Sequence, residues 1–390
     1  MTHGIITAAV AMLVASAAAA APYRPSDDGT VLVTVPHATA SMQIAFRNAQ
    51  NALAANPNDL NLALDVARAA IRDGRASADP RRYGQAQAAL APWWSIPNAP
   101  MSVRVLRAII RQNLHDFAGA AADLDAILGL DPRNGQARLT RAFVRQTVGA
   151  LADARDDCRR LPPSVGVTAA AVCLLRVEAL TGSAAASLER LDQLIEIDAK
   201  SEPLVRRWAQ AVAADMAVML GQTGAADLHF AKATAEGGDI PTLVAFADHL
   251  LDTDRPGEVL TLLAGRSEAD IVYLRLAIAG KRLNDPRAPQ WSTLLADRFA
   301  AAKAGGVQLH LREEARFELE VNGNAVTALG LARTNWTIQK EPSDARLVLQ
   351  AAVAANDPAA AADVLAFIEK TGLVDVRLKP LRDKIAEKPL

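Results

Sequence analysis

Apolar side chains recur every three or four residues through the middle of the chain, which is the spacing of one face of an α-helix. Between Met101 and Leu114 the apolar positions are Val103, Leu106, Ile110 and Leu114. A second run begins at Phe117 and ends before Asp131-Pro132, because proline cannot continue a helix. The pattern therefore predicts two helices joined by a short turn at His115-Asp116.

The same helical hairpin recurs 34 residues further along, since 141 − 107 = 34. The matching positions are Arg107-Ala108 with Arg141-Ala142, Ala120 with Ala154, Asp123 with Asp157, and Leu124 with Cys158. A fixed period in the thirties is typical of a solenoid in which helix pairs stack on one another. We therefore predict a helical-repeat array.

The second helix of this hairpin has a characteristic order of residue sizes. Small Ala120 is followed four residues later by large Leu124, and Pro132 comes after the helix. The same order returns in Ala226 and Phe230, behind a turn at Gly221. This pattern resembles the tetratricopeptide repeat. The resemblance implies an all-α, right-handed superhelical solenoid of about nine antiparallel helix pairs, elongated and curved, with a concave inner face.

We expect the solenoid to occupy residues 42–376, with a different segment on each side of it. Residues 21–41 combine prolines with a β-branched run, which favours an extended arm. Residues 377–390 are charged and suit a capping tail, because the end of a repeat array needs a polar outer face.

Residues 1–20 are predicted to be a signal peptide. The chain from Gly4 to Ala21 carries no charge and ends in an alanine run that offers small-residue cleavage sites, so we place the cut after Ala20. The first three residues contain no Lys or Arg, which leaves a retained membrane anchor as the alternative. No further segment is expected to cross a membrane, and the predicted location is periplasmic or secreted.

The chain has two cysteines, Cys158 and Cys173, on helices that should be neighbours in the array. An oxidising compartment outside the cytoplasm would allow a disulfide between them. Two buried thiols packed in the core are the alternative.

Composition excludes some classes of function. Apolar residues make up 51% of the chain but aromatics only 4%, which suits closely packed helices better than sheets. The formal net charge of −1 gives no field that would attract nucleic acid.

Catalytic and cofactor motifs are also missing from the sequence, which has no zinc-protease, nucleophile-elbow, phosphate-loop or dinucleotide pattern. His310, Glu313 and Glu314 lie close together on one predicted helix, but one helical turn supplies only part of a metal site. We interpret them as a solvated helix face, and we expect no cofactor, no metal and no enzymatic activity.

The concave face is the predicted binding surface, because the resemblance implies that peptides or proteins lie against the first helix of each pair. The residues assigned to it by helical phase are Gln112, Asn113, Phe143, Gln146, Arg176, Trp208, Asp215, Asp248, Tyr273 and Phe317.

Two hypotheses follow for the function. The first is a protein- or peptide-binding accessory factor of the bacterial cell envelope, whose oligomeric state the sequence leaves open. The second is an envelope glycan or small-ligand binder that stacks its ligand on Trp93-Trp94, Trp208 or Trp336.

Overall fold

A computed structural model describes residues 37–199, 201–235, 238–266, 269–305 and 310–387, and all regular secondary structure in these ranges is helical. The predicted signal peptide, and the predicted arm up to residue 36, lie outside the described residues. Packing divides the chain into two compact units, Met1–Arg47 and Asn48–Leu390. Helix α1 (His37–Ala55) crosses this division and begins before the predicted start of the solenoid at residue 42.

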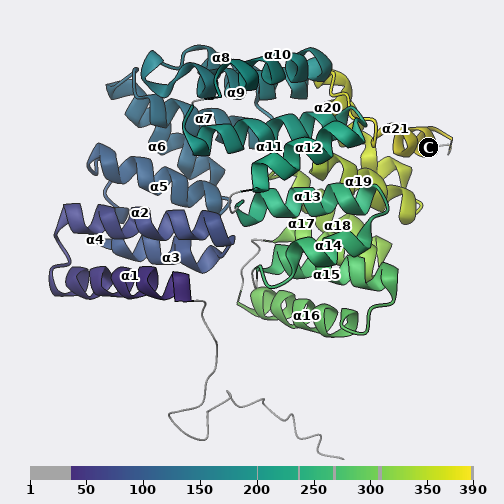
Figure 1. Cartoon of the computed structure of the whole chain (residues 1–390), viewed down its shortest axis with the longest axis horizontal. Helices are drawn as coiled ribbons and strands as arrows, with labels where there is room; N and C mark the ends of the chain where they lie inside the picture. The colour runs from purple at the N-terminus through teal and green to yellow at the C-terminus, as the bar shows by residue number, and fades with distance from the viewer. Residues whose placement is uncertain (1–36, 200, 236–237, 267–268, 306–309, 388–390) are drawn as a thin grey trace, which may run out of the picture. The chain divides into compact units, whose positions relative to one another are not determined.

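Nine helix pairs follow in the second unit, and they confirm the predicted all-α repeat array (Figure 1). The pairs are α2 (Leu60–Ser77) with α3 (Pro80–Ala89), α5 (Met101–Asn113) with α6 (Phe117–Leu130), α7 (Gly135–Thr147) with α8 (Leu151–Arg159), α9 (Val167–Glu178) with α10 (Ala184–Ile197), α11 (Pro203–Met219) with α12 (Thr223–Thr234), α13 (Ile240–Asp252) with α14 (Pro256–Leu263), α15 (Asp270–Leu283) with α16 (Ala288–Ala304), α17 (Leu311–Arg316) with α18 (Ala325–Trp336), and α19 (Pro342–Ala354) with α20 (Ala362–Thr371).

Shorter elements join or flank these pairs. They are α4 (Ala91–Trp94), η1 (Pro163–Val165), η2 (Ala179–Ser183), η3 (Phe317–Asn322), η4 (Pro358–Ala361) and α21 (Lys379–Ala386).

In each of the nine pairs, the turn that connects the two helices contains one residue whose φ is positive. These residues are Ala78, His115, Gly149, Gly182, Gly221, Asp254, Asn284, Gly323 and Asn356. Glycine adopts this left-handed conformation without strain, and asparagine and aspartate tolerate it better than most residues do. The turn at His115 and the turn at Gly149 are 34 residues apart (149 − 115 = 34), so the repeat period is visible in the backbone itself.

The sizes of the residues on the second helices explain how each pair closes. Ala120 and Leu124 of α6 are both fully buried, with the small residue at the point where helices approach closely. Ala154 and Cys158 of α8 take the corresponding positions and are buried too. The side chain of Asp116 caps α6 by accepting a hydrogen bond from the backbone N–H of Gly119 at 2.9 Å, which fixes where that helix begins.

A buried ion pair also repeats with the 34-residue period, and we call each copy a repeat lock. In the first repeat lock, Arg107 donates two hydrogen bonds to Asp123, from Nε at 2.9 Å and from Nη2 at 2.6 Å. In the second, Arg141 contacts Asp157 with the same two atoms at the same distances. Because each fork joins the first helix of a pair to the second, the repeat lock stabilises the hairpin itself.

The predicted disulfide is present between Cys158 of α8 and Cys173 of α9. It joins neighbouring pairs, with 5.6 Å between the two Cα atoms and a sequence separation of 15. Both residues are buried. The disulfide points to an oxidising compartment outside the cytoplasm.

The last pairs contact much earlier ones, beyond the stacking of neighbours. The backbone N–H of Lys340 donates to the carbonyl of Thr147 at 2.8 Å, and that of Val376 donates to the carbonyl of Met219 at 2.9 Å. One apolar cluster includes residues of α9 to α12 together with residues of α18 to α20. In a simple solenoid each repeat contacts only its neighbours. Here the C-terminal pairs also pack against the first helices of pairs near the centre of the chain.

One stretch, Val167–Ile197, is long and apolar enough to cross a membrane by length and composition, although the sequence analysis expected none after the signal. The backbone reverses within it, since Gly182 has φ +93° and Thr181 also leaves helical angles. The stretch is therefore two antiparallel helices, α9 and α10, that form one repeat pair.

Candidate functional site

The residues predicted to line the concave face lie on the first elements of six successive pairs and on η3. Gln112 and Asn113 end α5, Phe143 and Gln146 lie on α7, Arg176 on α9, Trp208 and Asp215 on α11, Asp248 on α13, Tyr273 on α15, and Phe317 begins η3. Eight of them are at least partly exposed, whereas Gln146 and Phe317 are buried.

Two pairs among these residues meet in space. The rings of Phe143 and Trp208 form an edge-to-face contact with centroids 5.5 Å apart. Arg176 lies 3.9 Å from a carboxylate oxygen of Asp215. These four side chains come from α7, α9 and α11, so consecutive first helices build one surface with an aromatic part and a charged part.

The remaining members contact other parts of the chain. Asp248 accepts hydrogen bonds from the buried Arg275 and from Arg316, and these two cations hold the pKa of its carboxyl well below the usual range although burial acts to raise it. Tyr273 lies under the guanidinium of Arg298, 5.2 Å from its ring centroid. Phe317 packs its ring against Phe299.

Gln146 is unusual because it is 5% exposed and neither atom of its side-chain amide has a hydrogen-bond partner among the described residues. Buried amides are normally paired. Asn113, by comparison, donates to the carbonyl of Ile109 at 2.7 Å.

The segment between α18 and α19 brings further charges to this surface. We define the central charged cluster as His115, Arg176, Asp215, Arg312, Glu313, Gln339, Glu341 and Asp344. Gln339 lies 3.2 Å from Nε2 of His115, and Arg176 lies 3.6 Å from Glu341. The cluster therefore combines side chains from α5 to α11 with side chains from α17 to α19.

One half of the central charged cluster is tightly hydrogen-bonded. Arg312 donates to Asp344 from Nε at 2.5 Å and from Nη2 at 2.8 Å, and its Nη2 also reaches Gln339 and Glu341. Asp344 further accepts from the amide of Asn335 at 2.7 Å and from the backbone N–H of Glu341 at 2.9 Å. A carboxylate with this many donors is satisfied by the protein and serves to hold α17, α18 and α19 together.

The other half is loosely paired. The contacts of Arg176 with Asp215 and with Glu341 are both longer than a hydrogen bond, and its side chain stays 30% exposed. The side chain of Asp215 is 49% exposed. The surrounding protein still removes water from around its carboxyl, and this desolvation raises the pKa of that carboxyl. Arg176 and Asp215 therefore keep hydrogen-bonding capacity that a partner could use.

Burial and nearby charges together shift the pKa values of His115 and Glu341. Burial lowers the pKa of His115, so this ring favours its neutral form. Burial acts to raise the pKa of Glu341, but attraction to Arg312 and Arg176 outweighs it and the pKa is lowered.

Most of the central charged cluster has no signal in the sequence. The prediction of a solvated helix face at His310, Glu313 and Glu314 is wrong in part, because these residues are only partly exposed. Arg312, on the same helical turn, is 22% exposed and is held by three acceptor side chains. The pattern Glu341-Pro342-Ser343-Asp344 was a usable signal, because it forms a capping box at the start of α19.

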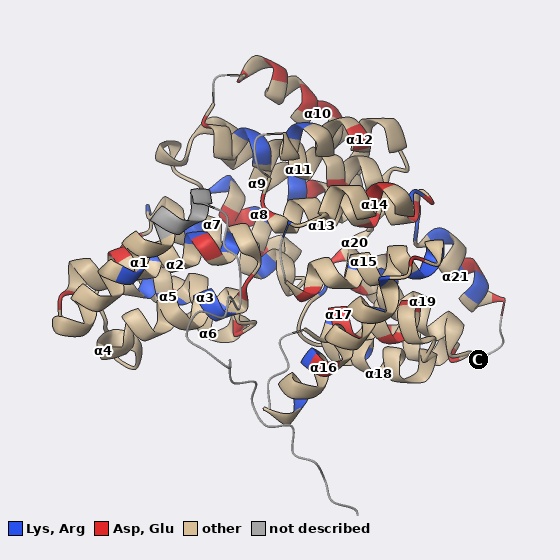
Figure 2. Cartoon of the chain, turned by 60° about the horizontal axis from the view of Figure 1, so that its bottom comes forward, with Lys and Arg blue, Asp and Glu red and all other residues tan. Residues whose placement is uncertain are grey.

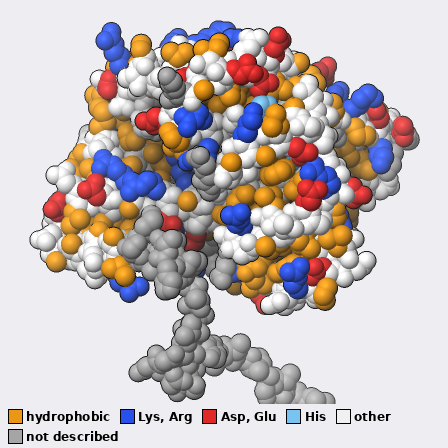
Figure 3. All heavy atoms as spheres, viewed as in Figure 1, with side chains coloured by type: hydrophobic (Ala, Val, Ile, Leu, Met, Phe, Trp, Pro, Cys, Tyr) orange, Lys and Arg blue, Asp and Glu red, His pale blue; other side chains and the backbone are white. Residues whose placement is uncertain are grey.

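The charges show no separation by sign. Figure 2 shows acidic and basic residues intermixed over the described helices. On the face in Figure 3, they are also interspersed with apolar and neutral side chains. Among the described residues, no group of three or more His, Cys, Asp or Glu is placed to hold a metal ion.

Comparisons with known proteins find similar folds among solved structures. No protein-family model matches the chain, and no curated protein sequence matches it. A tetratricopeptide repeat protein from Parabacteroides merdae is similar in structure, with 15% identity over 60% of this chain and 93% of that chain and a TM-score of 0.38.

Two further solved structures are similar at low identity. Yeast Tom70 is 11% identical over 90% of this chain and 85% of that chain, with a TM-score of 0.39. The human IFIT1 dimer with PPP-AAAA is 13% identical over 84% of this chain and 77% of that chain, with a TM-score of 0.47. With its nine helix pairs, left-handed turns and 34-residue recurrence, the chain is a tetratricopeptide-like helical-repeat protein.

Proposed function

We propose that this chain is a non-enzymatic scaffold that binds a protein or peptide of the bacterial cell envelope on the first helices α7, α9 and α11. The observation that carries the proposal is the surface formed by Phe143, Trp208, Arg176 and Asp215, where an edge-to-face aromatic pair accompanies two loosely paired opposite charges. Successive repeats supply such surfaces in a row, which suits an extended partner.

The chemistry of this surface indicates what kind of segment it would hold. Aromatic rings contribute apolar contact area, while Arg176 and Asp215 can each exchange their long mutual contact for a hydrogen-bonded one with a partner. A peptide that carries both an acidic and a basic side chain beside an apolar one fits these features. The proposed partner is not a nucleic acid, because the charges are of mixed sign and the net charge is −1.

The envelope location rests on two features. The alanine-rich segment before Ala21 has the form of a cleavable signal, and the bond between Cys158 and Cys173 suits an oxidising compartment. We therefore infer a mature protein that is exported to the periplasm or secreted.

The alternative function, stacking of a glycan or small ligand on tryptophan, is less favoured because the chain's own groups already contact the rings. Stacking needs an open ring face, whereas Trp208 already packs edge-to-face against Phe143 and Trp336 is only 6% exposed. The guanidinium of Arg111 lies over the ring of Trp94, 5.6 Å from its centroid.

The experiment is a capture from the solubilised envelope fraction by the mature protein and two sets of variants. Arg176→Glu and Trp208→Ala alter the proposed surface, and Arg159→Glu is the matched control, since Arg159 is exposed on α8. We expect wild type and Arg159→Glu to retain one envelope protein that both surface variants lose.

Thermal denaturation of each variant separates loss of binding from loss of folding. Equal capture by all folded variants, or turnover of an envelope substrate by the purified protein, would overturn the proposal.

A further inference from the structure

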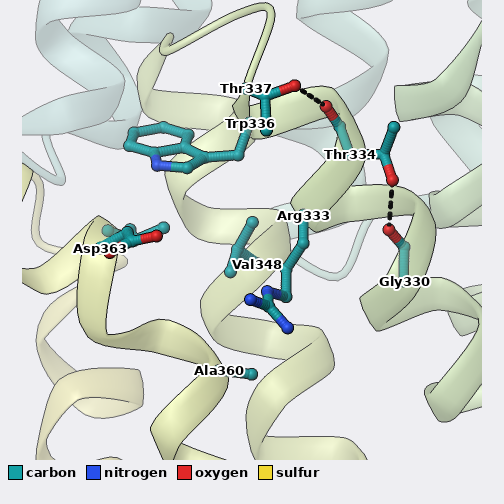
Figure 4. A pocket seen from close by; sticks show the side chains of 9 residues that line it. Gly330, Arg333, Thr334, Trp336, Thr337, Val348, Ala360 and Asp363 are labelled. Atoms are coloured by element: carbon teal, nitrogen blue, oxygen red, sulfur yellow. Dashed lines mark hydrogen bonds between the residues drawn. The ribbon is translucent and has the colours of Figure 1, made fainter.

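A pocket opens on the last two helix pairs, and none of its lining residues belongs to the surface of Phe143, Arg176, Trp208 and Asp215. Its volume is about 320 Å³, which lies at the lower end of the range for small-molecule sites. The residues that line it are Gly330, Arg333, Thr334, Trp336 and Thr337 of α18 and the turn after it, Val348 of α19, and Ala360, Asp363 and Val364 of η4 and α20 (Figure 4).

The inner wall of the pocket is apolar and firmly held. Val348 and Val364 are each 1% exposed, and Trp336 is 6% exposed, so these side chains belong to the core and only a small part of each borders the pocket. The ring of Phe367 packs edge-to-face on Trp336 with centroids 5.2 Å apart. This wall is therefore preorganised to receive an apolar group.

Two opposite charges line the same pocket without pairing. Arg333 comes from α18 and Asp363 from the first turn of α20, and both are exposed. Neither side chain forms a hydrogen bond or an ion pair with another described residue. In Figure 4 the carboxyl of Asp363 lies below the ring of Trp336, and the guanidinium of Arg333 extends past Val348 towards Ala360.

The hydroxyl groups on the pocket wall add acceptors. Thr334 donates its hydroxyl proton to the carbonyl of Gly330 at 2.9 Å, and Thr337 donates to the carbonyl of Thr334 at 2.7 Å. With their protons committed, both oxygens remain available to accept a hydrogen bond from a ligand N–H.

We propose that this pocket binds a small zwitterion with an apolar body, namely a short peptide with free amino and carboxyl ends. The carboxylate pairs with the guanidinium of Arg333, the ammonium pairs with the carboxylate of Asp363, and a small apolar side chain enters the pocket beside the edges of Trp336, Val348 and Val364. This site shares no lining residue with the surface of Phe143, Arg176, Trp208 and Asp215, and it does not depend on the proposed scaffold function.

The test is calorimetric titration of the mature protein with three matched probes: leucyl-leucine, N-acetyl-leucyl-leucine and leucyl-leucinamide. We expect leucyl-leucine to bind with a Kd of about 0.1–1 mM, as for a small ligand in a partly open pocket. Removing either charge from the probe should weaken binding about three- to ten-fold.

Variants assign each charge. Arg333→Gln should weaken leucyl-leucine but leave the affinity for leucyl-leucinamide unchanged, and Asp363→Asn should weaken leucyl-leucine but leave the acetylated probe unchanged. Both residues are exposed, so neither change should affect folding. Ala360→Phe should fill the pocket and abolish binding of all three probes.

The proposal is overturned if leucyl-leucine gives no binding heat at concentrations up to 10-fold above about 1 mM. It is also overturned if leucyl-leucine binds to Ala360→Phe as well as it binds to wild type. Capture of the envelope partner by Ala360→Phe should be normal, so failure of this site can be distinguished from failure of the scaffold proposal.

Discussion

Two regions of the molecule use the same pairing of arginine with carboxylate at very different sequence separations. In α5 to α8 the partners of each repeat lock are 16 residues apart and belong to one helix pair. In the C-terminal half, Arg316 reaches Asp248 across 68 residues, and Arg346 reaches Asp252 across 94. The first kind of pair stabilises one hairpin, whereas the second fixes which distant repeats meet.

The two kinds of pair also differ in burial. The side chain of Asp157 is 1% exposed, while those of Asp252 and Asp248 are 19% and 29% exposed. Breaking a buried pair leaves charges with neither water nor a partner, whereas water can replace part of an exposed one. The local pairs should therefore contribute more to the free energy of unfolding, although the long-range pairs determine the arrangement.

The largest expected effect comes from removing the acceptor of the second repeat lock. Asp157→Ala leaves Arg138, Arg141 and Arg145 without the carboxylate that accepts hydrogen bonds from all three. We expect the free energy of unfolding to fall by about 3–5 kcal/mol, measured by urea denaturation. Asp153→Ala, at an exposed position of the same helix, is the control and should change it by less than about 0.5 kcal/mol. Similar losses in both variants would show that the repeat lock adds no stability.

The next effect concerns the disulfide, which joins two neighbouring pairs within the regular region. Replacing both Cys158 and Cys173 by alanine should cost about 3 kcal/mol, because the unfolded chain regains the freedom of a closed loop of this size. Wild type treated with a reductant should lose stability in the same way, and the double variant should not respond to it. Thiol labelling of the unfolded, unreduced protein should find no free thiol, and two free thiols would contradict the bond.

The smallest effect comes from a long-range pair, and it tests the comparison most directly. Asp252→Ala removes the acceptor shared by Arg346 and Arg377, and we expect a loss of about 1–2 kcal/mol. Hydrogen exchange should quicken in α13 and α19 together while α5 to α8 stay protected. The division into local and long-range pairs would be refuted if exchange became faster throughout the chain, or if the exchange rate changed in no helix. Asp254→Ala in the turn after α13 is not a suitable control, because Asp254 has positive φ, so Asp297→Ala on α16 is used.

Much of the fold could be predicted from the sequence because its signals are local. The 34-residue recurrence, the Ala120 and Leu124 spacing and the cysteine positions all reflect contacts within a pair or between neighbours, and the structure confirms them. The predicted short turn at His115-Asp116 is also confirmed, with His115 in the left-handed conformation that histidine adopts more often than most residues do. Alanine rarely adopts this conformation, so the sequence does not indicate that Ala78 is the left-handed residue of its turn.

The central charged cluster could not be predicted, because periodicity carries no information on which distant repeats meet. His115 and Gln339 are 224 residues apart, and nothing in either helix pattern indicates their contact. Helical phase did place Arg176 and Asp215 on one surface, since that inference needs only consecutive first helices. Phase could not foresee that Phe317 would be buried against Phe299.

The two backbone hydrogen bonds that join Lys340 to Thr147 and Val376 to Met219 bear on how this protein can evolve. Open repeat arrays can gain or lose a unit with little disturbance elsewhere, because each unit contacts only its neighbours. Duplication or deletion of one helix pair between residues 219 and 340 would move both donors away from their acceptors, and one elsewhere between residues 147 and 376 would move one of them. Related proteins should therefore keep the number of repeats between residues 147 and 376 constant, while their lengths vary before and after this interval.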